Sequence, residues 1–98
     1  MAEWSFLTNH ARVLLFIAEH PQARLRDLAE TLDVTERTAF GVVADLTVAG
    51  YVVKQRDGRR NRYDIQEHLP LRDSIGRERT IGELLDLLVE VRRGREPS

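Results

Sequence analysis

The fold is decided by residues 27–65, DLAETLDVTERTAFGVVADLTVAGYVVKQRDGRRNRYDI. Apolar residues recur at helical spacing in two runs, and between the runs lies Asp33, which tolerates the left-handed conformation of a tight turn. Gly50 follows the second run, at the position where a glycine ends a helix. The stretch therefore predicts two helices, over residues 27–32 and 36–49, joined by a tight turn.

The pattern of the sequence changes after this second helix. Residues 51–55 are β-branched and aromatic, which indicates a strand. Asp57-Gly58 is a strong hairpin signal, because glycine adopts positive φ without steric cost. Residues 61–65 supply the return strand. An antiparallel hairpin is therefore expected directly behind the second helix.

Two further helices flank this stretch. The first begins after the N-cap candidate Thr8 and ends before Pro21, which disfavours helical geometry in the residue preceding it. The second begins after Thr80, which forms a capping-box pattern with the glutamate three residues on, and it continues to about residue 93. Residues 23–25 are short and could form one extended rung.

The order of elements is helix, rung, helix, tight turn, helix, hairpin and helix. The expected fold class is mainly α with a small β-hairpin: a winged helix-turn-helix plus a C-terminal dimerisation helix. We assign residues 1–66 to the winged helix-turn-helix DNA-binding domain. Residues 67–98 form the linker and the C-terminal helix.

Composition excludes several classes of protein. The chain of 98 residues is one small domain, and without cysteine it has no disulfide, thiol nucleophile or thiolate metal site. The three histidines lack the spacing of metal ligands, and no catalytic or dinucleotide-binding motif is present. No apolar run is long enough to span a membrane, and no segment reads as a signal peptide. We expect a cytoplasmic protein that is not an enzyme, without cofactor, metal or membrane partner.

The formal net charge of −1 hides a basic segment. Residues 54–62 contain five cations and a single acid, Asp57, whereas the rest of the chain is mildly acidic. A solvated hairpin whose charges prevent edge aggregation is the simpler interpretation. The position of the segment behind a helix-turn-helix favours contact with DNA phosphates or the minor groove. That interpretation needs the five cations on one surface, next to the exposed side of the preceding helix.

The side of helix 36–49 opposite its apolar stripe is expected to enter the major groove. Arg37 could contact guanine, or pair with an acid on the protein surface. Thr38 or Phe40 could contact a thymine methyl group, but the sequence leaves open whether Phe40 faces DNA, the core or a subunit contact. Thr35 could contact a phosphate, cap the helix, or do both. The residues predicted to bind double-stranded DNA are Arg26, Thr35, Glu36, Arg37, Thr38, Phe40, Lys54, Arg56, Arg59, Arg60, Asn61 and Arg62.

The C-terminal helix carries an apolar stripe that is wide for so small a domain. It could pack on the first helix of the same chain, or pair with a second chain in a homodimer, which is the interpretation we favour. The predicted dimerisation residues are Trp4, Phe6, Leu14, Phe16, Ile81, Leu84, Leu85, Leu88 and Val91.

Five motifs carry a resemblance that extends over nearly the whole chain. They are WSFLTNHA at 4–11, LRDLA at 25–29, TERT at 35–38, VADL at 43–46 with AGY at 49–51, and GRRNRY at 58–63. The chain resembles small winged helix-turn-helix transcriptional regulators of the MarR/ArsR-like type. The resemblance implies sequence-specific DNA binding, usually as a dimer, and control of transcription.

The chain departs from this family at Phe40 and Gly41, where related sequences tend to carry long polar residues. Direct base readout by hydrogen bonds is therefore expected to be sparse. The alternative function is a winged-helix protein-interaction module with weak or lost DNA binding. No residue identifies a small-molecule effector.

Overall fold

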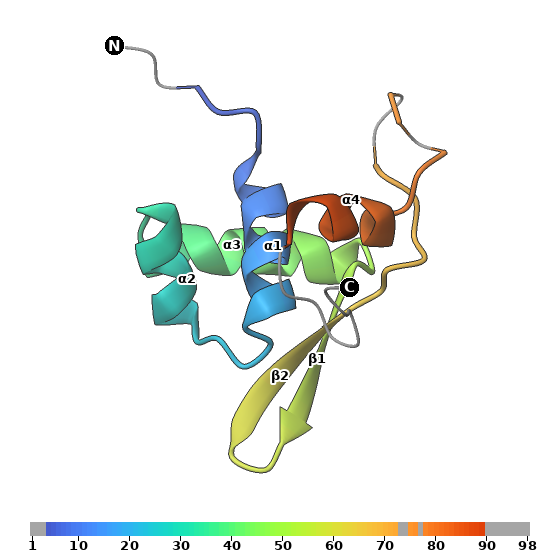
Figure 1. The fold of residues 1–98 in the computed structure, drawn as a ribbon. Helices are drawn as coiled ribbons and strands as arrows, with labels where there is room; N and C mark the ends of the chain where they lie inside the picture. The colour runs from blue at the N-terminus through green and yellow to red at the C-terminus, as the bar shows by residue number, and fades with distance from the viewer. Residues whose placement is uncertain (1–3, 73–74, 77, 90–98) are drawn as a thin grey trace, which may run out of the picture.

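The computed structural model describes residues 4–72, 75–76 and 78–89. Its elements, in chain order, are α1 (Asn9–Glu19), α2 (Leu25–Leu32), α3 (Glu36–Val48), β1 (Val52–Asp57), β2 (Arg60–Ile65) and α4 (Ile81–Leu88). The predicted class, mainly α with one small hairpin, is confirmed (Figure 1).

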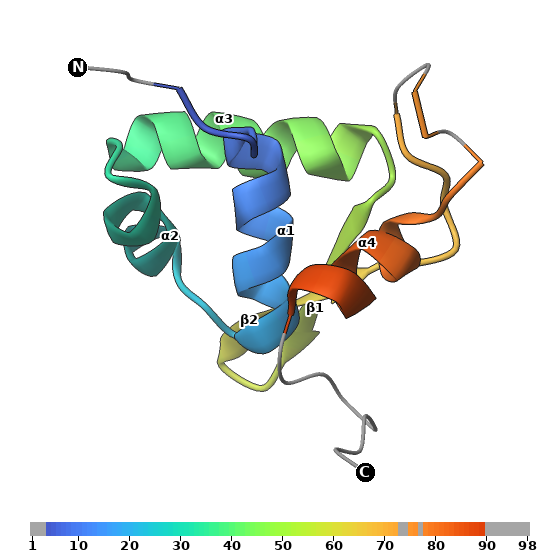
Figure 2. The ribbon, with the colours of Figure 1, turned by 45° about the horizontal axis from the view of Figure 1, so that its top comes forward.

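α1 is the element around which the others are arranged. It packs against α2, α3, β2 and α4, and Figure 2 shows it running from α3 toward the hairpin, with α2 and α4 on opposite sides. Thr8 caps its start by accepting the Ala11 amide at 3.2 Å, as predicted. The helix ends at Glu19, two residues before Pro21, because the residue before a proline is restricted to extended geometry.

α2 begins two residues earlier than the sequence indicated. The Asp27 carboxylate accepts the Arg24 backbone amide at 3.0 Å, so the acid caps the helix from its third position. The extended rung predicted over residues 23–25 is therefore wrong, since Leu25 already belongs to the helix. The connector between α1 and α2 is nevertheless bonded to the hairpin, because the Tyr63 amide donates to the Pro21 carbonyl at 2.9 Å.

The turn between α2 and α3 forms as the sequence predicted. Asp33 ends α2 with φ 60° and ψ 48°, the left-handed conformation that a short polar side chain tolerates. Two residues on, Thr35 caps α3 by accepting the Thr38 amide at 3.0 Å. This local geometry sets the angle between the two helices of the helix-turn-helix.

β1 and β2 form a two-stranded antiparallel hairpin. Gly50 (φ +90°) lets the chain leave α3, and the Tyr51 amide donates to Leu46 O at 3.0 Å. The register pairs Val52 with Ile65 and Lys54 with Tyr63. β1 packs against α3 while β2 packs against α1, so the hairpin is fixed at its base on both helices.

α4 ends sooner than predicted. Its start is capped as expected, because the Thr80 hydroxyl accepts the Glu83 amide and the Glu83 carboxylate accepts the Thr80 amide. Helical geometry ends at Leu88, and Val89 is extended (φ −99°, ψ 120°) with its side chain buried. The predicted continuation through residue 89 is wrong, because Val89 leaves the helix to enter the core. Val91 and residues 92–94 lie outside the described residues.

The C-terminal helix packs within its own chain, against α1. Three of the predicted dimer contacts, Leu14, Ile81 and Leu85, are 4%, 6% and 0% exposed and belong to the core of one protomer. The same three residues also line the groove between α1, α3 and α4, so their part in a dimer interface stays a prediction. Among the remaining predicted contacts that are described, Trp4, Phe6 and Leu88 are exposed, and Phe16 and Leu84 are half-buried.

Candidate nucleic-acid interface

α3 has a buried side and an outward side. Ala39, Val42, Val43 and Leu46 lie in the core. The outward side begins with Glu36, Arg37 and Thr38, all exposed. The helix therefore presents its first turn to solvent, as a helix that enters a DNA groove must.

Phe40 is 62% exposed. The alternative that it packs into the core is therefore wrong. Its neighbour Gly41 is also exposed, and a Cβ atom added there would meet nothing within 4 Å. The centre of the outward side therefore consists of the Phe40 ring beside a gap, which is the space left by the absent side chain of Gly41.

Thr35 has a structural role. In addition to capping α3, its hydroxyl donates to Thr38 Oγ1 at 3.1 Å. Arg26 is exposed in the first turn of α2. Both residues lie near helix N-termini, where backbone amides favour anions.

The hairpin carries the basic segment, and its predicted contact residues Lys54, Arg56, Arg59, Arg60, Asn61 and Arg62 are all exposed. In an antiparallel pair, directly opposed residues share a face. The register therefore places Lys54 and Arg56 on the face of Tyr63, and Arg60 and Arg62 on the other face. The expectation of a single cationic surface is wrong, because alternation along the strands divides the cations between both faces. Burial raises the pKa of the Tyr63 phenol at the base of the first face.

Three of the hairpin arginines have partners in the same chain. Arg62 Nε lies 3.2 Å from Asp64 Oδ1, and Arg60 Nη1 donates to Gln22 Oε1 at 3.3 Å. Arg56 Nε donates to the Gly58 carbonyl at 3.3 Å, within the hairpin turn. Exposed ion pairs contribute about 0.2–1 kcal/mol, so Arg62 can exchange Asp64 for a phosphate at small cost.

Lys54, Arg56 and Arg59 form no ion pair with any side chain that the structure describes, a set that does not include the side chain of Asp57. These three cations are therefore not neutralised by a described neighbour. They lie on the strand next to α3 and in the turn beyond it.

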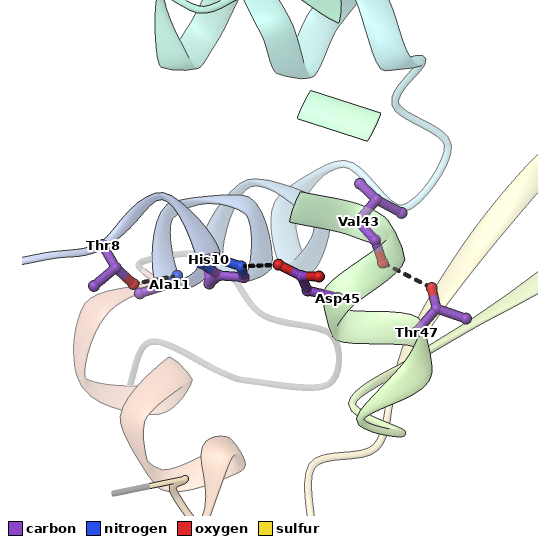
Figure 3. Close-up of polar contacts among 6 residues, drawn as sticks. All are labelled: Thr8, His10, Ala11, Val43, Asp45 and Thr47. Atoms are coloured by element: carbon purple, nitrogen blue, oxygen red, sulfur yellow. Dashed lines mark hydrogen bonds and ion pairs between the residues drawn. The ribbon is translucent and has the colours of Figure 1, made fainter. Parts of the chain in front are cut away.

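A polar contact that the sequence did not reveal holds α3 against α1. His10 Nε2 and Asp45 Oδ2 form a hydrogen bond of 2.8 Å across 35 positions of sequence (Figure 3). No local pattern in the sequence could identify Asp45 as the partner of His10. The contact joins α1 to α3 at the surface, because the Asp45 side chain is 70% exposed.

Two kinds of feature are absent from the described residues. No helix among them has the length and apolar composition that a membrane span requires. In the same residues, no three His, Asp or Glu side chains are close enough together to hold a metal ion.

A helix-turn-helix followed by a basic hairpin defines a winged helix-turn-helix protein. The model of the MarR family matches residues 5–62, which include both helices of the motif and most of the hairpin. The chain belongs to the MarR family of winged-helix transcription regulators, whose members are not enzymes. No curated protein matches the chain in sequence.

Proposed function

We propose that this chain binds double-stranded DNA as a homodimer, with α3 in the major groove and the hairpin against phosphates or the minor groove. The observation that carries the proposal is the pairing of an exposed first turn of α3 with three hairpin cations that no described acid neutralises. Lys54, Arg56 and Arg59 are these cations. Two copies supply about six phosphate contacts in a dimer, and these contacts make binding depend on salt.

The homodimer is supported by apolar side chains that the protomer leaves exposed. A groove between the start of α1, the end of α3 and α4 is flanked by Phe6 and Val48, which are 91% and 89% exposed. Trp4 packs edge-on against Phe6, with ring centroids 5.0 Å apart. A symmetric contact covers such a patch on both chains at once. Sedimentation at micromolar concentration should give a species twice the 11.3 kDa chain mass. A single monomeric species contradicts this part of the proposal.

The DNA-binding part is tested by a fluorescence-polarisation titration with random duplex DNA at several salt concentrations. Six phosphate contacts give a slope of log K against log salt of about −5. Replacing Lys54 and Arg59 with Ala removes four of the six contacts in a dimer and flattens the slope to about −2. The paired change Arg72→Ala and Arg79→Ala removes the same charge from the connector before α4 and serves as the control. An unchanged slope in the hairpin variant contradicts the assignment.

The alternative function is a protein-interaction module, and the exposed ring of Phe40 favours it. An aromatic side chain on an exposed helix face suits a protein partner as well as DNA. Failure of the wild-type protein to bind any duplex at low salt would support this alternative. Tight binding that weakens steeply with salt supports the regulator.

A further inference from the structure

We infer that α3 reads DNA through the C5-methyl groups of thymine, with Phe40 as the contacting side chain and Gly41 as the gap that lets the helix approach the bases. This inference rests on the proposed function and adds the chemical group that is recognised.

Beyond its first turn, α3 offers almost no hydrogen-bonding group to a base. The Asp45 carboxylate is bonded to His10, and the Thr47 hydroxyl donates to the Val43 carbonyl at 2.8 Å (Figure 3). The other positions there outside the core are Phe40, Gly41, the half-buried Ala44 and Val48, which have no polar side-chain atoms. Whatever the middle of the helix recognises must therefore be recognised by apolar contact.

The glycine has no structural explanation. Gly41 lies inside a helix, where glycine is the least favourable residue after proline, and its φ is not positive. A Cβ atom would meet nothing within 4 Å, so the fold does not require its absence. A gap without a packing role is explained by the close approach of a partner.

Only one apolar group is presented by base edges in the major groove. It is the C5-methyl of thymine, since the other edges carry hydrogen-bond donors and acceptors. The ring of Phe40 projects into solvent from the helix face that would enter the groove. A thymine methyl is therefore the group that Phe40 can bury, and the missing side chain at Gly41 removes the nearest obstacle.

The test begins with a selection of binding sites from random duplex DNA. Each thymine of the selected site is then replaced singly by deoxyuridine, which lacks only the methyl group. For the wild-type protein, we expect affinity to fall about fourfold at one or two positions, the effect of one buried methyl group. For Phe40→Ala, the same replacements should change nothing. Leu87→Ala, which truncates another exposed apolar side chain on α4, should keep the wild-type response.

Two outcomes overturn the inference and can be told apart. Binding that no deoxyuridine replacement weakens, or a loss that persists in Phe40→Ala, overturns methyl readout while the proposed function stands. Absence of binding to any duplex at low salt overturns the proposed function and the inference with it.

Gly41→Ala provides a second measurement. Alanine favours the helix, so the melting temperature should rise by about 4–8 °C. Affinity for the selected site should fall about tenfold or more, because the new methyl group occupies the space that the bases enter. A variant that melts higher and binds equally well overturns the role assigned to Gly41.

Discussion

Gly82→Ala tests how α4 is attached to the rest of the protein. Gly82 occupies the second position of α4, and its amide donates to the Glu67 carbonyl at 2.9 Å. A Cβ atom at this position would lie 3.0 Å from Glu67 Cβ and 3.1 Å from both Glu67 O and Glu67 Oε1. Two of these three atoms are backbone or the first side-chain carbon, so they cannot move aside as the end of a long side chain can.

Two opposing effects determine how much Gly82→Ala changes the free energy of unfolding. Alanine gains up to about 1 kcal/mol over glycine within a helix, and less in a first turn. Forcing a methyl group into a closely packed contact costs about 1–3 kcal/mol. Because the Glu67 carbonyl is also held by the Gly82 amide, a shift that relieves the clash weakens that bond. The clash therefore outweighs the helix gain, and a net loss of about 1 kcal/mol is expected.

Thermal unfolding followed by circular dichroism measures this loss. For a domain of this size, about 1 kcal/mol lowers the melting temperature by about 4–8 °C. Gly41→Ala is the matched control, since it adds the same methyl group to a helix where nothing lies within 4 Å. The two alanine variants should shift the melting temperature in opposite directions. If Gly82→Ala melts at or above the wild-type temperature, the close approach of α4 to Glu67 does not constrain the fold as argued.

Two further predictions concern polar contacts. The backbone amide of Thr80, aided by Arg79, lowers the pKa of Glu83 below its ordinary value of 4.5. The ionised carboxylate therefore stabilises the folded state fully above pH 4.5, and this stabilisation is lost as the pH falls through the lowered pKa. Glu83→Gln should therefore be less stable than wild type in urea at pH 7 and equally stable near pH 2; a difference that persists in acid contradicts the capping role. The His10–Asp45 bond should give a coupling of about 0.5–1.5 kcal/mol in a double-mutant cycle with His10→Ala and Asp45→Ala, and additive single effects would show that the bond does not stabilise the packing of α3 on α1.

Much of the fold could be predicted from residues three or four positions apart. Thr8, Thr35 and Thr80 each cap a helix through a bond to a residue three positions on. Asp33 and Gly50 take the positive φ values that their positions require. Such signals need no knowledge of the rest of the chain, since both partners lie in the same turn.

The same locality explains the error at the end of α4, whereas the early start of α2 depends on a local bond, from the Arg24 amide to Asp27, that the sequence analysis missed. The stop at Leu88 depends on Val89 being drawn into a core that the helix alone does not contain. The sequence also could not predict which residues of the C-terminal apolar stripe contact α1. Hydrophobic periodicity gives the width of an apolar helix face but does not identify the element that packs against it. The sequence therefore could not separate the buried Leu85 from the exposed Leu88.

The features of the candidate interface also fall into those that the sequence predicted and those that only the structure decided. The sequence by itself determined the basic hairpin, its turn at Asp57-Gly58 and its place behind a helix-turn-helix. Only the tertiary structure decided that Phe40 faces solvent and that His10 holds Asp45. These outcomes depend on how separate helices pack, and packing joins residues whose distance along the chain carries no signal of their distance in space.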